Sequence, residues 1–273
     1  MTPLLPHLRR PLRLNKILGF YLGPIKVYLI TGQQNVQVMF RKIDAVSSDK
    51  FGLLIMANLW GATKEDLAKF ANDKSGRLEV PEPGESANGM QSNLKSQEQR
   101  RRYWAGFHRV LRDYLARPNE TDKLAESYQR LFAERLDSFA VGEWTTISVV
   151  SFMRTHMAEC AIISLVGPRI LELNPGFCQL LWDFDEISLS LVWGLPRWMN
   201  RQAWEKRDRY RAACARYLEA AWAGFDPAGA EADSDWEPNF GSRFARELAK
   251  WMRESNFSLE TSAGIVAITA IAG

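Results

Sequence analysis

The sequence has few of the side chains that most metal sites and nucleophilic active sites use. Among its 273 residues there are three cysteines and three histidines. The cysteines are Cys160, Cys178 and Cys214. They form no C-x-x-C pair, and so small and odd a number favours reduced thiols in a cytosolic setting over a disulfide framework. His156 precedes Cys160 by four residues with no third ligand nearby, so we expect no metal site.

The common catalytic motifs are missing as well. The sequence contains no G-x-G-x-x-G, no G-x-x-x-x-G-K-S/T, no G-x-S-x-G and no H-E-x-x-H. These absences disfavour the usual dinucleotide-binding, P-loop, α/β-hydrolase and zinc-protease sites, and no catalytic residue is predicted. The formal net charge is +3, from 35 basic and 32 acidic residues. That balance gives no reason to expect a nucleic-acid partner.

Long apolar runs are scarce too. A membrane-spanning helix needs roughly 20 apolar residues, and the mostly apolar segment 17–30 is shorter and holds Gly19, Gly23, Pro24 and Lys26. No membrane anchor is therefore evident, although a basic, apolar N-terminus is compatible with contact at a membrane surface. With 46% hydrophobic residues, the chain can still bury a large core.

The region 17–72 predicts a small β-region followed by the first helices. Ile25–Thr31 alternates and is rich in branched side chains, which indicates a strand. A short helix is expected at Gln33–Lys42. The apolar run Phe51–Trp60 fits either a buried strand or a buried helix, because its periodicity does not distinguish them.

A helix start and a long loop follow. Thr63 and Asp66 have the spacing of a capping box that opens a helix through Phe70. Residues 73–96 are rich in Gly, Pro, Ser and Asn, which predicts a loop. A loop of this length is either a binding loop or a surface excursion.

The strongest helical pattern in the sequence lies at Gln97–Leu115. Apolar residues recur there on one helical face, at Tyr103, Trp104, Phe107, Val110, Leu111, Tyr114 and Leu115. Arg100, Trp104 and His108 share one stripe, and a cation, an indole and an imidazole in a row suit the anionic edge of a large planar ligand. The same spacing also fits a surface helix with a solvated basic flank and a buried aromatic stripe.

The region 97–273 otherwise predicts mostly helices. Thr121 or Asp122 is expected to cap a helix that runs to about Phe139. Glu143–Val149 is a strand candidate by composition. Phe152–Val166 is apolar almost all round, which predicts a central buried helix.

Three further helices are predicted toward the end of the chain. Asn174, with Pro175 after it, is expected to cap one of them. Arg201–Trp222 predicts a long helix whose basic face is typical of a solvated surface. Ser242 is expected to cap the helix Arg243–Glu254.

The acidic group Asp183, Asp185 and Glu186 has the composition of a paired-carboxylate acid/base site. However, Asp183 and Glu186 fall opposite the apolar face of their helix. A solvated edge is therefore the better interpretation.

The segment Leu259–Gly273 is apolar and rich in small residues up to its last position. It predicts the first half of a long buried helix. Apolar side chains and unpaired carbonyls would lie in the core at such an end, so we expect that the sequence is truncated.

The order of these segments carries a resemblance to a known family. The stretch RRYWAGFHRVLRDYL is similar to the C helix of a fungal cytochrome P-450. It is followed in family order by EWTTIS, SFMRTHMAECAIISLVGPRIL, NPGF, GLPRW, a long basic helix and the apolar final segment. The resemblance covers nearly the whole chain, and it implies a mainly α structure that forms the N-terminal half of the cytochrome P-450 fold, with a small β-region near the N-terminus.

The resemblance also implies roles for particular residues. In the family, a Trp-x-x-x-Arg pattern on the C helix holds a haem propionate. Trp104 matches the tryptophan, and His108 occupies the arginine position, so these two residues are the predicted cofactor contacts. Ala272 and Gly273 would begin the Ala-Gly-x-acid-Thr pattern of the oxygen-side helix.

Two family motifs are not found in their places. No cysteine stands in the Phe-x-x-Gly-x-x-x-Cys-x-Gly loop that supplies the thiolate ligand of the iron. The only Glu-x-x-Arg, Glu98 to Arg101, precedes the final apolar helix instead of following it. We therefore predict that this polypeptide alone binds haem poorly and has no monooxygenase activity.

The resemblance implies a fragment of a haem-dependent monooxygenase that inserts one oxygen atom into an apolar, lipid- or sterol-like substrate. A reductase would be its partner, contact with the membrane would be peripheral, and the family's usual location is the endoplasmic reticulum membrane. A hypothesis of another class is a non-catalytic helical interaction protein or a truncated paralogue without haem. Cooperative unfolding of a soluble, haem-free monomer would favour that alternative.

Overall fold

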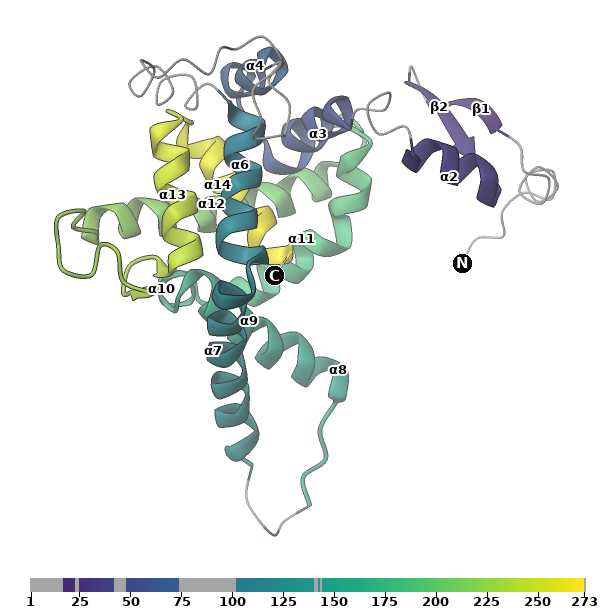
Figure 1. The fold of residues 1–273 in the computed structure, drawn as a ribbon. Coiled ribbons are helices and arrows are strands. Elements are labelled where there is room, and N and C mark those ends of the chain that lie inside the picture. Colours follow the sequence, from purple (N-terminus) through teal and green to yellow (C-terminus); the bar gives the residue numbers. More distant parts are fainter. Residues whose placement is uncertain are drawn as a thin grey trace. The chain divides into compact units, whose positions relative to one another are not determined.

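The structure, a computed structural model, describes residues 17–22, 25–41, 48–73, 102–139, 142 and 144–272. It is mainly helical, as predicted (Figure 1). The chain divides into two compact units, Met1–Phe51 and Gly52–Gly273. Most of the predicted loop 73–96 lies outside the described residues.

The first unit contains a β-hairpin and a helix. Strand β1 (Ile17–Leu22) pairs antiparallel with β2 (Ile25–Ile30), and α2 (Gln33–Arg41) follows. The predicted strand and helix at these last two positions are confirmed, whereas β1 was not predicted. None of the described side chains of this unit is buried. A hairpin of two strands is marginally stable by itself.

The second unit holds a continuous hydrophobic core made by helices. Its elements, with the helix that leads into it, are α3 (Asp49–Ile55), η2 (Met56–Trp60), α4 (Lys64–Asn72), α6 (Tyr103–Leu111), η3 (Arg112–Ala116), α7 (Pro118–Asp137), α8 (Val149–Phe152), η4 (Met153–Met157), α9 (Ala158–Val166), α10 (Arg169–Leu173), α11 (Phe177–Val192), α12 (Arg201–Gly224), β3 (Trp236–Glu237), β4 (Gly241–Ser242), α13 (Arg243–Glu254) and α14 (Leu259–Ala272). The η segments are π-helical turns. The ambiguous apolar run Phe51–Trp60 is thus helical.

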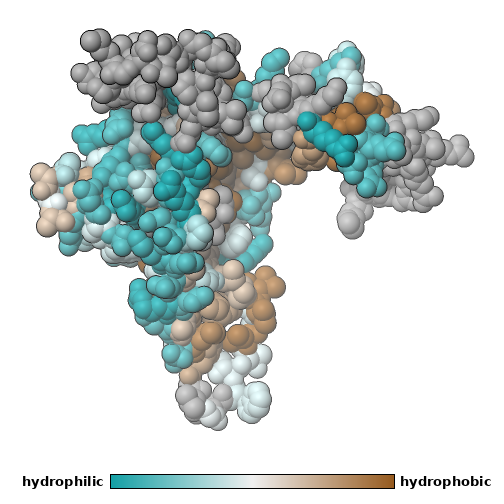
Figure 2. All heavy atoms as spheres, in the orientation of Figure 1, coloured by the Kyte–Doolittle hydropathy of each residue, from teal (hydrophilic) through white to brown (hydrophobic). Residues whose placement is uncertain are grey.

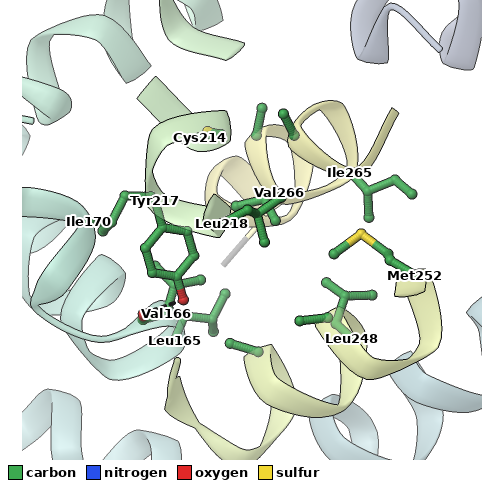
Figure 3. Close-up of a cluster of buried hydrophobic side chains, with 14 of the residues drawn as sticks. Leu165, Val166, Ile170, Cys214, Tyr217, Leu218, Leu248, Met252, Ile265 and Val266 are labelled. Carbon is green, nitrogen blue, oxygen red and sulfur yellow. Dashed lines mark hydrogen bonds between the residues drawn. The ribbon is translucent and has the colours of Figure 1, made fainter. Parts of the chain in front are cut away.

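Helix α12 lies at the centre of the core, against α11 on one side and α14 on the other. Figure 3 shows side chains from five helices meeting there: Leu165, Val166, Ile170, Cys214, Tyr217, Leu218, Leu248, Met252, Ile265 and Val266. The hydroxyl of Tyr217 donates to the carbonyl of Val166 at 2.9 Å, which satisfies a polar group inside this apolar cluster.

Two predicted helix starts are confirmed in detail. The hydroxyl of Thr63 accepts a hydrogen bond from the backbone N–H of Asp66 at 3.2 Å at the start of α4. The hydroxyl of Ser242 accepts one from the backbone N–H of Ala245 at 3.2 Å at the start of α13. Both are N-caps of the usual kind.

Other predicted boundaries are wrong. Helix α7 begins at Pro118, not after Thr121, because proline is well placed at the first helical position. The hydroxyl of Thr121 donates instead to the carbonyls of Leu115 and Arg117. Asn174 does not cap α11, since Gly176 takes that place in a left-handed conformation.

The predicted strand Glu143–Val149 is also wrong. Residues 144–148 have no regular structure, and Val149 begins a helix whose cap is Ser148. A branched composition predicts a strand only where another strand can pair with it, and the described residues around this segment are helical.

The helical run α8, η4 and α9 is buried only at its far end. Cys160, Ile162, Leu165 and Val166 lie in the core, but the first half of the run is exposed. The prediction of a buried central helix is therefore right for α9 and wrong for the start of the run. By length and composition, Val149–Val166 could cross a membrane, a property that core helices of soluble proteins share.

Candidate functional site

The first candidate residue, Trp104, lies in the core at the start of α6. Its backbone N–H donates to the carboxylate of Asp73 at 3.0 Å, and its indole N–H donates to the carbonyl of Phe70 at 2.9 Å. The Trp104 ring meets that of Phe70 edge to face, with 5.0 Å between centroids. These contacts attach α6 to the end of α4 and fix the orientation of the indole.

The second candidate, His108, lies one turn later on the same helix but is exposed. Within the part of the chain that the structure describes, its imidazole has no hydrogen bond or ion pair. The same stripe of α6 therefore carries one buried donor that already has an acceptor and one exposed donor that is available. Arg100, the third residue of the predicted stripe, lies outside the described residues.

Helix α14 contains the other predicted position, Ala272, as its last residue, and Gly273 lies outside the described residues. The start of α14 packs very closely on η2. A Cβ atom on Gly264 would come 2.0 Å from the carbonyl oxygen of Trp60. Only glycine allows this approach, because any side chain would collide with backbone.

A buried carboxylate holds the beginning of α14. Asp66 on α4 accepts hydrogen bonds from the backbone N–H and the hydroxyl of Ser258, at 3.0 and 2.7 Å. It also pairs with Lys69 at 2.8 Å. Burial raises the pKa of the Asp66 carboxyl, but hydrogen bonds from Lys69, Thr261 and Ser258 outweigh burial and lower the pKa to about 2. The negative charge is also well placed at a helix N-terminus.

Lys69, the partner of Asp66, binds backbone carbonyls at the C-terminal end of the preceding helix, α13. Its ammonium donates to the carbonyl of Asn256 at 2.6 Å and to that of Ser255 at 3.3 Å, just after α13. A cation at a helix C-terminus is favourable for the same reason that an anion is favourable at an N-terminus. One turn of α4 therefore fixes the connection between α13 and α14.

The prediction of a solvated basic face on α12 is right for Arg201, Arg209 and Arg216, which are exposed, and wrong for Arg207 and Arg211, which are structural. Arg207 donates to the carbonyl of Asn58 at 2.8 Å. Arg211 donates to the carbonyls of Gly61 and Glu260, at 2.9 and 2.8 Å. These bonds satisfy the free carbonyls at the end of η2 and hold η2 against the start of α14. The sequence pattern identified the charges but not their partners, which are 49 to 150 positions away.

Tyr210 connects α12 to the middle of α14. The side chain is fully buried between Phe177 and Phe184, whose rings lie 5.2 Å from it. Its hydroxyl donates to the carbonyl of Ala267 at 3.0 Å. Burial raises the pKa of Tyr210 well above its ordinary value, so the residue stays a hydrogen-bond donor.

The cysteines do not fit the role of a thiolate ligand to iron. Cys160 and Cys214 are buried in helices and Cys178 is partly buried. Burial raises the pKa of all three thiols, that of Cys178 to about 11, so they are protonated at neutral pH. Within the described residues, no group of three His, Cys, Asp or Glu side chains is arranged to hold a metal ion.

Two surface hollows differ in their linings. One of about 360 Å³ lies between the start of α7 and α13, and its lining includes Asp113, Arg117 and Arg243, which suits polar groups better than an apolar ligand. Another, of about 460 Å³, lies between α7, α9 and β3, and its lining mixes the charged Lys123 and Asp235 with the apolar Leu124, Ile163 and Trp236.

Comparison with curated proteins identifies relatives of the chain. It is 44% identical over 255 residues to cytochrome P450 monooxygenase calL of Penicillium decumbens, an alignment that covers 93% of this chain and 46% of the relative. Cytochrome P450 monooxygenase fsoE of Humicola fuscoatra is 30% identical over 161 residues, which is 57% of this chain and 28% of that protein. Cytochrome P450 monooxygenase efuG of Hormonema carpetanum is 28% identical over 144 residues, 51% of this chain and 25% of that protein.

No protein-family model matches the sequence. No solved structure matches it either. An alignment of 255 of the 273 residues necessarily includes α6 and the central helices α11 and α12, and the mainly α structure agrees with it. The chain therefore belongs to the cytochrome P450 monooxygenases, and it spans about half of the length of the Penicillium relative, or less of the other two.

Proposed function

We propose that this chain supplies the N-terminal half of a haem-thiolate monooxygenase that inserts one oxygen atom into an apolar, lipid- or sterol-like substrate. The observation that carries the proposal is the 44% identity to calL along 93% of the chain. The order of helices, from α6 to the apolar α14, supports it. A reductase is the proposed electron donor.

Haem is the cofactor of this family, and bound haem with a thiolate ligand supplies the activation of oxygen. In this chain, Trp104 and His108 are the proposed contacts to a haem propionate. His108 is exposed and offers an N–H, whereas the indole of Trp104 would have to exchange the Phe70 carbonyl for the propionate. Ala272 and Gly273 are proposed to begin the oxygen-side wall.

The protonated, core-bound thiols support the further proposal that these 273 residues bind haem weakly and do not catalyse oxygen insertion. The test is a haem titration of the purified chain, followed by the spectrum of its reduced CO complex. We expect weak binding and no absorption maximum of the thiolate type. A typical thiolate maximum would contradict the proposal, because burial raises the pKa of all three thiols.

The propionate contacts are tested in the same titration with Trp104→Phe and His108→Ala. We expect each variant to weaken haem binding about tenfold, the loss of one hydrogen bond to a charged group. His156→Ala is the matched control, because it removes a partly exposed imidazole from η4. Equal haem affinity in all three variants would exclude Trp104 and His108 as contacts.

Peripheral membrane contact is proposed for the turn between α11 and α12. Trp198 is 82% exposed and Met199 56%. Arg197 and Arg201 beside them pair with Asp208 and Glu205, at 2.9 and 2.6 Å, but their side chains remain 60% and 82% exposed. Exposed aromatic and apolar side chains with cations nearby are typical of interfacial contact. Flotation with anionic vesicles, compared between the wild-type chain and Trp198→Ser, tests this proposal, and unchanged flotation would exclude the turn.

A second candidate function is the non-catalytic helical protein. The observation in its favour is that buried polar groups of the helices bind one another: Tyr210 of α12 binds α14, Tyr217 of α12 binds α9, and Asp66 of α4 binds the start of α14. A cooperative thermal transition of a haem-free monomer would support it. Aggregation of the same chain would count against it.

A further inference from the structure

Arg243, the first residue of α13, carries a charge that has no acceptor within the described part of the chain. The side chain is partly buried, and its Nε is buried without a hydrogen-bond partner. Its guanidinium forms no ion pair with any described carboxylate and stacks instead over the ring of Tyr114, 5.5 Å from the centroid. Partial burial of an unpaired charge costs free energy, and an anion from outside the chain would offset that cost.

The Arg243 side chain lines the hollow of about 360 Å³ between the start of α7 and α13. Further hydrogen-bond donors line the same hollow, from Tyr114 in η3, Arg117 before α7 and Asn119 in the first turn of α7. Figure 2 shows mainly hydrophilic side chains over the face where α6, α7 and α13 meet. Burial raises the pKa of Tyr114, so its hydroxyl keeps its proton at neutral pH. Donors from three parts of the fold therefore surround one small space.

The two carboxylates in the lining are already bound by other cations. Arg112 and Arg117 both lie 2.9 Å from Oδ1 of Asp113. Lys123 lies 3.3 Å from Glu120 and 2.7 Å from Asp235. The cations therefore outnumber the carboxylates by one in this group, which consists of Arg112, Arg117, Lys123 and Arg243 with Asp113, Glu120 and Asp235. An excess of positive charge beside free donors suits an anionic ligand.

We propose that this hollow binds the phosphate group of a phosphate monoester, with Arg243 as its main contact. A guanidinium presents parallel N–H groups that match two phosphate oxygens, and a phosphate has further oxygens for Arg117, Tyr114 and Asn119. A carboxylate has only two oxygens and would leave some of these donors unused. The volume is within the range of small-molecule sites, so the hollow also accommodates the group that carries the phosphate. The proposal uses neither of the proposed haem contacts.

The test is a calorimetric titration of the full 273-residue chain with inorganic phosphate at constant ionic strength. We expect saturable binding of one phosphate per chain. Arg243→Gln should weaken it about 30-fold, because the paired hydrogen bonds to a charged group are lost. Arg243→Lys, which keeps the charge but not the paired geometry, should weaken it about fivefold. Arg209→Gln is the matched control: it removes an exposed arginine of α12 and should bind as the wild-type chain does.

Two further ligands distinguish the sources of the phosphate group. Glycerol 3-phosphate carries a phosphate monoester in solution, and vesicles that contain phosphatidic acid carry one on a lipid. Tighter binding of the first would assign the hollow to a dissolved monoester, and tighter binding of the second to a lipid headgroup. Either result supports the proposal when Arg243→Gln weakens that binding, which also separates the hollow from the exposed turn at Trp198.

Circular dichroism establishes that each variant is folded. If Arg243→Gln does not fold, Tyr114→Phe replaces it, because this change keeps the ring and removes one donor, with an expected weakening of about fivefold. Absence of phosphate binding by the wild-type chain would overturn the proposal, as would equal phosphate affinities of the wild-type chain and these variants. An equal loss in Arg209→Gln and Arg243→Gln would also overturn it, because the chain would then respond only to net charge. Haem is absent from this titration, so the haem proposal has a separate readout.

Discussion

Helix α14 and the run α8–η4 have similar apolar sequences and opposite environments. In α14, Ala263, Ile265 and Ala267 are at most 1% exposed. In the other run, Val149 and Val150 are about two-thirds exposed. The first helix is surrounded by α12 and η2, whereas the second extends beyond the elements that pack on α9. Both segments have apolar side chains that burial would stabilise. Whether these side chains are buried depends on which other elements pack against them.

The difference extends to polar groups. Asp66 holds the first turn of α14, Arg211 binds the carbonyl of Glu260 there, and Tyr210 binds the carbonyl of Ala267. These interactions orient α14 and leave little freedom for movement. The run α8–η4 has the cap by Ser148 at its start, and the indole N–H of Trp182 donates to the carbonyl of Arg154 at 2.7 Å, but Val149 and Val150 stay exposed. Mutations should therefore have large effects on stability around α14 and small ones at Val149 and Val150.

The largest effect is expected for Gly264→Ala. The new methyl group would lie 2.0 Å from the carbonyl oxygen of Trp60, so α14 and η2 must separate. Overpacking of this kind should reduce the free energy of unfolding by about 3 kcal/mol. Urea denaturation followed by circular dichroism measures the change. A loss below about 1 kcal/mol would mean that the two elements are not in contact.

Asp66→Asn should rank second. The pKa of the Asp66 carboxyl is about 2 in the folded chain against its ordinary 3.8, so the charge stabilises the fold above about pH 4 and the stabilisation is lost as the pH falls toward 2. The shift corresponds to about 2 kcal/mol. Unfolding measured from pH 7 to pH 3 should show a smaller loss of stability for the variant than for wild type. Asp185→Asn, at an exposed site on α11, is the control and should keep the wild-type profile.

Tyr210→Phe should have an intermediate effect of about 1 kcal/mol, the typical net value of one hydrogen bond. The ring contacts with Phe177 and Phe184 are kept, so the loss reports the bond to Ala267 alone. Thermal unfolding is a sufficient measurement. Tyr21→Phe, at a side chain 70% exposed, should leave the transition unchanged. Equal transitions for both variants would show that the hydroxyl of Tyr210 does not stabilise α14.

The smallest effect is expected for Val150→Ala. Its side chain is 68% exposed, so truncation should change the free energy of unfolding by less than about 0.5 kcal/mol. Urea denaturation of the chain alone provides the value. A loss above about 1 kcal/mol would show that the Val150 side chain is already covered, and the contrast with α14 would disappear.

Much of the fold followed from local patterns. The capped starts of α4 and α13 and the extent of α13 agree with their predicted positions, because Thr63 and Ser242 act on backbone groups only three residues away. The strand at Glu143–Val149 and the cap at Asn174 were predicted wrongly because the conformations there depend on distant segments of the chain. Asn174 binds the carbonyl of Ala213, 39 positions away, and accepts from Arg216, so its role depends on α12.

The candidate site was predictable only in part. The helical stripe on α6 gave Trp104 and His108, but its period could not show that one is buried and the other exposed. That outcome depends on α4, whose Phe70 carbonyl receives the indole N–H. Asp66 was identified as part of a capping box, whereas its bonds to Ser258, 192 positions away, required the folded chain.

The sequence by itself determined the family, the mainly α class, the short-range caps and the scarcity of ionisable thiols, since each depends on residue types and close spacings. The tertiary structure alone decided that Arg207 and Arg211 of α12 bind carbonyls, that Asp66 joins α4 to α14, and that α9 is buried while most of the run α8–η4 is not. The physical reason is that burial and hydrogen-bond partners are properties of pairs of segments. The residues of one segment determine its periodicity and its caps, but they do not determine which other segment packs against it.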